Sequence, residues 1–227
     1  MQSRNMPILP SLCLLLLLAM TTRNLLAAEE FLSLADGTAI KVLYFAPKSA
    51  VTEPRLALLI SGANSNTYMA RAQFWLGKEL VSRGWSIAVP IAPDNTGFGG
   101  ENAQLLPEIT QQLQSLHGRN SNNPLLIGIS SGGTTAIEIA LRYPTSFSGV
   151  VAAPGLVQNE NLQALQGLPV YLRIGEKDDF RWDRQLYAMA GKLRDAGAEV
   201  DAAIVADAKH IFQLDWDDLE RWLNSLQ

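Results

Sequence analysis

The sequence has 227 residues, enough for one α/β domain with a full hydrophobic core. Its 22 acidic and 18 basic residues give a formal net charge of −4 with no basic cluster, which argues against a nucleic-acid partner. The single cysteine, Cys13, lies near the N-terminus, so a chain that lost residues 1–28 could form no disulfide and would have no thiol nucleophile.

The first residues have the layout of a secretory signal peptide. Basic Arg4 precedes an almost entirely apolar run, residues 8–20, and the small residues Ala27 and Ala28 follow before acidic Glu29. The apolar run is shorter than the roughly 20 residues of a membrane span. We therefore expect a signal peptide over residues 1–28 and a secreted or periplasmic domain over residues 29–227, without a membrane span after cleavage. An N-terminal anchor that stays uncleaved is the alternative.

Next in the chain, alternating strand and helix patterns predict an α/β fold. The runs 30–34 and 39–45, joined by the turn signal Asp36-Gly37, predict an antiparallel hairpin at the sheet edge. Further strands are predicted at residues 56–60, 85–89, 125–127, 147–152, 169–174 and 199–205, and helices at residues 69–83, 104–116, 134–143, 159–165, 183–196 and 213–226. This order favours a mainly parallel twisted sheet with helices on both faces. In such sheets, ligands bind beyond the carboxyl ends of the strands.

The most specific motif follows the strand at residues 125–127. Gly128-Ile129-Ser130-Ser131-Gly132 has the G-x-S-x-G pattern of a nucleophile elbow, and a predicted strand and helix flank it as that motif requires. The glycines remove side chains from a tight turn, so that the Ser130 hydroxyl projects above a helix N-terminus. Ser130 is therefore the predicted nucleophile; the alternative is a turn that only packs a helix on a sheet.

A serine nucleophile needs a base and an orienting carboxylate. His210 follows the last strand at its carboxyl end, which is the same edge as Ser130, whereas His117 is expected at the opposite end as a surface residue or helix cap. The strand at residues 169–174 leads to Asp178 and Asp179, either of which can reach that edge. Asp183 is more simply expected to cap a helix.

Acyl transfer also needs donors for the oxyanion. We expect one from the backbone N–H of Ser131 and another from the loop after residue 60, through Ala63 or Asn64. The alternative for that loop is a plain turn. Tyr68, Phe180 and Trp182 are candidates for substrate contact, although aromatic side chains at such positions can equally belong to the core or the rim.

Together these motifs give the chain a resemblance to small members of the α/β-hydrolase superfamily. The matching segments are residues 128–133, 174–178 and 209–212, and the likeness extends over residues 31–227. The resemblance favours Asp178 over Asp179, because the family commonly places its acid three residues after a strand-ending glycine. It also implies the triad Ser130, Asp178 and His210. The short segment 153–168, where larger members insert a lid, implies that there is no cap domain.

The sequence thus predicts a serine hydrolase that cleaves an ester of a small molecule through an acyl-enzyme, without a metal or organic cofactor. A thioester or a small amide is an alternative substrate. Two other functions remain open at this point: a non-catalytic binding module of the cell envelope, and an acyltransferase that uses the same triad.

Overall fold

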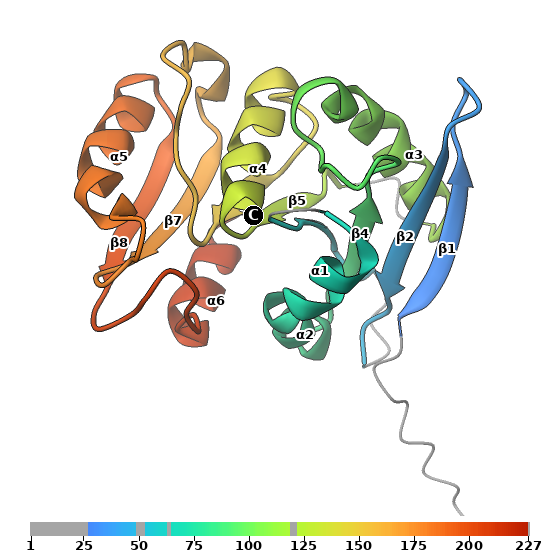
Figure 1. Cartoon of the computed structure of the whole chain (residues 1–227), viewed down its shortest axis with the longest axis horizontal. Coiled ribbons are helices and arrows are strands. Elements are labelled where there is room, and N and C mark those ends of the chain that lie inside the picture. The colour runs from blue at the N-terminus through green and yellow to red at the C-terminus, as the bar shows by residue number, and fades with distance from the viewer. Residues whose placement is uncertain (1–26, 49–52, 63–64, 119–121, 227) are drawn as a thin grey trace, which may run out of the picture.

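A mixed sheet forms the middle layer of the molecule, with helices on both of its faces (Figure 1). The computed structural model describes residues 27–48, 53–62, 65–118 and 122–226. Residues 1–26, which hold most of the expected signal peptide, lie outside these ranges. The strands are β1 (Ala28–Ser33), β2 (Ala39–Phe45), β3 (Leu56–Ile60), β4 (Ser86–Ile91), β5 (Leu125–Gly128), β6 (Gly149–Ala152), β7 (Pro169–Gly175) and β8 (Glu199–Val205). The helices are α1 (Thr67–Ala72), α2 (Trp75–Ser82), α3 (Leu106–Leu116), α4 (Ser131–Arg142), α5 (Leu186–Asp195) and α6 (Trp216–Asn224), with 3₁₀ helices η1 (Gly100–Leu105), η2 (Gln163–Leu165) and η3 (Trp182–Gln185).

The strand order confirms the predicted fold class. Within the described chain it is β1-β2-β4-β3-β5-β6-β7-β8. β1 pairs antiparallel with β2, and β2 with β4, whereas the neighbours from β4 to β8 are parallel. The predicted turn closes the first hairpin: Gly37 has a φ of +86° and the Asp36 carboxylate accepts the Thr38 N–H at 2.8 Å. The carboxyl ends of the parallel strands therefore share one edge.

Two apolar layers hold the helices on the sheet. α3, α4 and α5 cover one face, and α1, α2 and α6 cover the other (Figure 1). All residues of β3 and β5 are buried, as expected for strands covered on both faces. The strand that leads to Ser130, β5, is therefore enclosed on both faces.

The helix predicted over residues 69–83 is instead two helices. α1 ends before Gln73 and α2 begins at Trp75, because Phe74 turns into the core and stacks on Phe45 with ring centroids 3.5 Å apart. Helical periodicity is similar on both sides of this break, so it gave no signal of the interruption.

Two other expected features differ from the structure. The helix expected at residues 159–165 is only the 3₁₀ helix η2, and the segment 153–168 contains no other regular element. Asp183 does not cap α5: it lies inside η3 and pairs with Arg181 at 3.3 Å, while Gln185 precedes the helix. The Asp183 carboxylate therefore accepts a hydrogen bond from the neighbouring Arg181 side chain and does not cap a helix N-terminus.

An ion-pair cluster joins β7, β8 and α6. Buried Arg173 pairs with Asp201 at 2.9 Å and with Asp218 on α6. Partial burial alone would raise the pKa of Asp218, but hydrogen bonds from Arg221, Arg173 and Tyr171 outweigh it and lower that pKa to about 2. The Asp218 carboxylate therefore stays ionised well into the acidic range, and its contacts with Arg173 and Tyr171 tie the C-terminal helix to the sheet.

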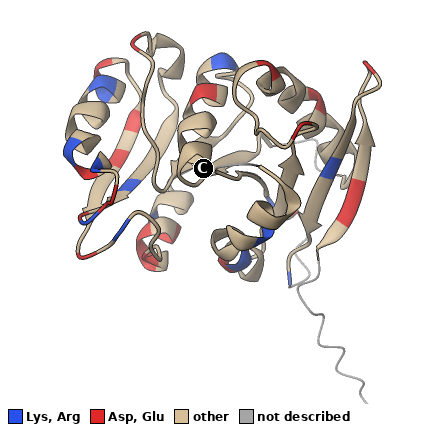
Figure 2. Cartoon of the chain, viewed as in Figure 1, with Lys and Arg blue, Asp and Glu red and all other residues tan. Residues whose placement is uncertain are grey.

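Charged residues of both signs are interspersed along the elements (Figure 2). Within the described ranges, no helix combines the length and the apolar character that crossing a membrane requires.

Candidate active site

Ser130 occupies a strained turn between β5 and α4. Its backbone has φ 59° and ψ −127°, a combination that is costly for a residue with a side chain. A Cβ atom on Gly128 would overlap the carbonyl of Gly132, and one on Gly132 would overlap the carbonyl oxygen of Ile60. Both glycines are therefore needed for the close approach, as the nucleophile-elbow pattern predicts.

The hydroxyl of Ser130 faces His210, and His210 faces Asp178. Ser130 Oγ lies 2.8 Å from His210 Nε2, and His210 Nδ1 lies 2.7 Å from Asp178 Oδ2. Asp178 is 1% exposed and His210 is 7% exposed, so water screens their interaction weakly. The structure thus brings together three side chains that are 32 and 80 residues apart in sequence.

Backbone contacts join the loop after β7 to the loop after β8. The N–H of Lys177 donates to the carbonyl oxygen of Ala208 at 2.7 Å, and the Asp207 N–H donates to the Glu176 carboxylate at 2.9 Å. A Cβ atom on Gly175 would overlap the carbonyl oxygens of Ala208 and Lys209. The strand-ending glycine therefore lets the two loops pack directly on each other, which holds the acid and the histidine together.

The residues alone did not decide whether Asp178 or Asp179 would contact the histidine. In the structure, Asp178 contacts His210. Asp178 also accepts the Phe180 N–H through Oδ1 at 2.8 Å, whereas Asp179 is exposed. His117 follows α3 as its C-cap residue, with its ring stacked on Tyr44 at a centroid distance of 3.7 Å. The structure therefore places His117 away from Ser130, as expected.

Of the expected oxyanion donors, the structure describes only Ser131. Ser131 is the first residue of α4. Ala63 and Asn64 lie outside the described residues. The adjoining Gly62 N–H donates to Gln73 Oε1 at 2.7 Å. Sequence reasoning missed Gln73, because a glutamine inside an apparently continuous helix carries no local signal for a contact of this kind.

Two aromatic rings surround the histidine. The rings of Phe180 and Trp182 contact His210 edge-on, with centroids 4.6 Å and 4.9 Å from the imidazole. Phe180 is nevertheless 66% exposed, so most of its surface faces solvent at the rim. Tyr68 lies in the first turn of α1 and is also exposed, without a described contact to the histidine ring. Phe180 and Trp182 therefore form the apolar wall that adjoins His210.

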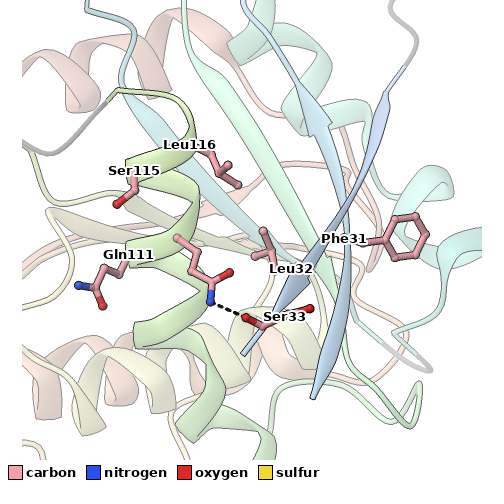
Figure 3. Close-up of a pocket in the computed structure, with 7 residues that line it drawn as sticks. Phe31, Leu32, Ser33, Gln111, Ser115 and Leu116 are labelled. Carbon is pink, nitrogen blue, oxygen red and sulfur yellow. Dashed lines mark hydrogen bonds between the residues drawn. The ribbon is translucent and has the colours of Figure 1, made fainter. Parts of the chain in front are cut away.

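Two surface hollows differ in their relation to this site. One of about 590 Å³ includes Ile211, which follows His210 in the chain; its lining is Trp75, Lys78, Glu79, Ile211, Phe212, Gln213 and Trp216. The other, about 570 Å³, lies between β1 and α3 and is lined by Phe31, Leu32, Ser33, Gln111, Gln112, Ser115 and Leu116 (Figure 3). There the Gln112 side-chain amide donates to the Ser33 carbonyl at 2.9 Å. β1 is four strand positions from β5, or roughly 19 Å, so this second hollow is separate from Ser130.

Among the described residues, no three His, Cys, Asp or Glu side chains form a group that could hold a metal ion.

The chain matches a protein-family model and many solved structures. The Esterase family model, described as "Putative esterase", matches residues 37–226. No curated protein sequence matches the chain.

The solved structures include esterases of similar size and longer peptidases. The Bacillus cereus carboxylesterase is 18% identical with a TM-score of 0.64, and the match covers 83% of this chain and 95% of that one. A thermostable carboxyl esterase from Bacillus coagulans, solved with glycerol, is 11% identical with a TM-score of 0.65, covering 89% and 97%. Dipeptidyl peptidase 4 of Porphyromonas gingivalis is 18% identical with a TM-score of 0.65, covering 88% and 35%. This chain spans between 35% and 38% of the length of the peptidases it matches.

At these identities, the structural likeness establishes the fold. The family match covers most of the chain and adds the enzyme class. The chain therefore belongs to the Esterase family within the α/β-hydrolase superfamily, and it is an esterase-like hydrolase.

Proposed function

We propose that the chain is a serine esterase that works through an acyl-enzyme on Ser130. The observation that carries this proposal is the continuous hydrogen-bonded line from Ser130 Oγ through His210 to Asp178, with contacts of 2.8 Å and 2.7 Å. A serine hydroxyl is a weak nucleophile without an adjacent base. In this arrangement His210 is the base and Asp178 holds it in one tautomer.

In the first half of the reaction, Ser130 Oγ attacks the ester carbonyl carbon while its proton passes to His210 Nε2. The carbonyl π pair moves to oxygen, and the resulting tetrahedral oxyanion accepts hydrogen bonds from backbone N–H groups. We assign these to Ser131 and to Ala63 or Asn64, beside a helix N-terminus that favours negative charge. When the oxyanion collapses, the bond to the alkoxy group breaks and that oxygen takes the proton from His210 Nε2.

In the second half, water attacks the acyl-enzyme and repeats these proton transfers. His210 accepts a proton from the water and returns one to Ser130 Oγ as the acid leaves. The buried carboxylate of Asp178 accepts the Nδ1–H of His210 throughout, and it stabilises the imidazolium that forms twice in each cycle. The products are a carboxylic acid and an alcohol, and the serine is regenerated.

The rim supports an ester with an apolar or aromatic group as substrate. Phe180 and Trp182 form an apolar wall beside His210, and we propose them, with exposed Tyr68, as substrate contacts. The short segment 153–168 carries no cap domain, so the site is open to small-molecule esters. A thioester carbonyl fits the same chemistry, and a small amide requires the same protonation of its leaving group.

Covalent labelling tests the nucleophile and the base. A fluorophosphonate probe is expected to label the purified chain, with labelling lost in Ser130→Ala and in His210→Gln. His117→Gln is the matched control, because its ring stacks on Tyr44 far from the elbow, and it should label like the wild type. Labelling of Ser130→Ala at the wild-type rate would refute the assignment.

A panel of chromogenic esters of increasing acyl length then tests the substrate class. We expect turnover of small esters that rises with apolar character, and loss of that preference in Trp182→Ala. Product analysis with added alcohols separates hydrolysis from acyl transfer: free acid as the main product supports the esterase, and an ester of the added alcohol supports an acyltransferase.

A further inference from the structure

The imidazole of His210 is held by two hydrogen bonds and by two aromatic rings. Its Nδ1 and Nε2 atoms lie 2.7 Å from Asp178 Oδ2 and 2.8 Å from Ser130 Oγ. The rings of Phe180 and Trp182 lie steeply inclined to the imidazole, at interplanar angles of 73° and 86°. Two of these four contacts belong to the proposed reaction, and the two aromatic contacts have no chemical part in it.

One short segment carries both the acid and the two rings. The Asp178 carboxylate accepts the Phe180 N–H at 2.8 Å, and the Asp178 carbonyl oxygen accepts the Arg181 N–H at 3.0 Å. Arg181 has a left-handed backbone with φ 60°, a conformation found mostly in turns. The turn therefore brings the ring of Trp182 back to the histidine that Asp178 orients.

The two rings are anchored to different degrees. Trp182 is partly buried and packs against the apolar layer beneath α3, α4 and α5. Phe180 is exposed, and its ring centroid lies 6.2 Å from that of Trp182. Trp182 is thus the contact fixed to the core, while Phe180 still presents most of its surface to solvent for the substrate contact proposed above.

Formation of the acyl-enzyme removes one of the two hydrogen bonds to His210. Ser130 Oγ is then bonded to the acyl carbon, and its proton has left with the alcohol. It has no proton to donate to His210 Nε2, so the bond of the free enzyme no longer orients the ring. The remaining bond to Asp178 tolerates a range of tilts, because hydrogen-bond angles above about 150° are all favourable. The aromatic contacts do not depend on the state of the serine.

We propose that Phe180 and Trp182 are positioning residues for deacylation: they keep His210 oriented toward the attacking water while Ser130 is acylated. This inference rests on the proposed acyl-enzyme mechanism. In deacylation the water oxygen attacks the acyl carbon and a water proton passes to Nε2; the bond from that carbon to Oγ then breaks as Nε2 returns a proton to Oγ. Since the serine hydroxyl itself holds Nε2 during acylation, loss of a ring should slow deacylation more than acylation.

The kinetic test compares ring removal, ring replacement and a distant control. Trp182→Leu and Phe180→Leu each remove a ring and keep an apolar side chain, and Trp182→Phe keeps a ring. Phe31→Leu is the matched control, since Phe31 is similarly exposed but lies at the hollow in Figure 3. The substrates are p-nitrophenyl acetate and phenyl acetate, which form the same acetyl-enzyme and therefore share one deacylation step. Burst kinetics and intact-mass spectrometry measure the acetyl-enzyme, and kcat/KM reports acylation.

Each single substitution to leucine is expected to slow deacylation about 2- to 10-fold, the range that one aromatic pair contributes. The double variant should lose about 5- to 100-fold if the two contacts are independent. In all three, kcat/KM should stay within about threefold of the wild type, so the acetyl-enzyme accumulates and both acetates reach the same kcat. Trp182→Phe should recover most of the deacylation rate, and Phe31→Leu should match the wild type.

The variant Ser130→Ala reproduces the loss of the serine hydrogen bond without any turnover. The chain has two histidines, so isotope labelling of histidine gives ring signals for His210 and His117 alone in the NMR spectrum. The ring of His117 is stacked on Tyr44 and serves as the internal reference. In Ser130→Ala the imidazole of His210 should keep one orientation. It should become mobile when Trp182→Leu is added, and more so when both aromatic rings are removed.

Four results would overturn the proposal: a His210 ring already mobile in Ser130→Ala alone, a ring that stays rigid without both aromatic side chains, a kcat/KM that falls as much as the deacylation rate, or deacylation in the double variant within about twofold of the wild type. If variants of Trp182 do not fold, Phe180→Leu decides, because Phe180 is exposed; unchanged deacylation then overturns the proposal. If the wild type forms no acyl-enzyme at all, the esterase function fails instead, and the NMR comparison still shows whether the rings hold the imidazole.

Discussion

The substitution Asp178→Asn tests how the histidine is oriented, because the structure determines which way the new amide must face. Asp178 Oδ1 accepts the Phe180 N–H at 2.8 Å and Oδ2 faces His210 Nδ1 at 2.7 Å. Phe180 requires an acceptor, so the asparagine oxygen should face Phe180 and its NH₂ group should face His210. That group donates to Nδ1, which moves the ring proton to Nε2. The Ser130 hydroxyl then has no base to accept its proton.

The size of the effect follows from two costs. Turning the amide around to restore the active tautomer would leave the Phe180 N–H facing another donor, at a cost of about 1–3 kcal/mol. The charge-assisted hydrogen bond to the imidazolium that forms in the transition state is also lost, about 1.5–3 kcal/mol. Together these costs predict that kcat falls by about 10²- to 10⁴-fold, since each 1.36 kcal/mol corresponds to about a factor of ten.

The assay is steady-state hydrolysis of a chromogenic ester, accompanied by thermal unfolding to establish that the variant is folded. The matched control is Asp179→Asn, because its carboxylate is exposed and does not meet His210. It should keep kcat within about twofold of the wild type, as expected of a surface change. A folded Asp178→Asn variant that retained more than a tenth of the wild-type kcat would refute the tautomer argument.

Two further substitutions test the elbow and the C-terminal cluster. Gly132→Ala should lower the free energy of unfolding by about 1–3 kcal/mol and reduce fluorophosphonate labelling, because its methyl group would overlap the Ile60 carbonyl oxygen. Gly191→Ala in α5, where the methyl group meets open space, should be neutral or stabilising in the same urea titration, and equal losses in both would contradict this reasoning. Asp218→Asn should cost about 2–3 kcal/mol at pH 7, since it removes one partner of buried Arg173. The folded-state pKa of Asp218 is lowered to about 2, so its stabilising contribution is complete above the unfolded pKa near 4 and disappears as the pH falls through about 2. The gap between wild type and variant should therefore narrow over that interval, and a gap independent of pH would argue against the ion pair.

Local patterns in the sequence were sufficient for the order of elements and for the elbow. Buried strands such as β3 and β5 appear as continuous apolar runs, and the hairpin is marked by Asp36-Gly37. These signals are short-range, because backbone conformation responds mainly to neighbouring residues and to the periodicity of apolar side chains. They therefore predicted the parallel sheet, and they predicted that Ser130 and His210 would lie at the same edge.

The tertiary structure decided every contact that depends on a side chain from a distant segment. The residues alone did not decide whether Asp178 or Asp179 orients the histidine. Packing of the loop after β7 on the loop after β8, at Gly175, buries Asp178 beside His210 and leaves Asp179 exposed to solvent. Likewise, the break at Gln73 depends on Phe74 finding Phe45 across the fold. A short stretch of sequence gives the identity of each residue. It does not show which residue from a distant segment will form a hydrogen bond with it or pack against it. For this chain, the positions of the proposed chemical groups follow from the sequence, and their geometry follows from long-range packing.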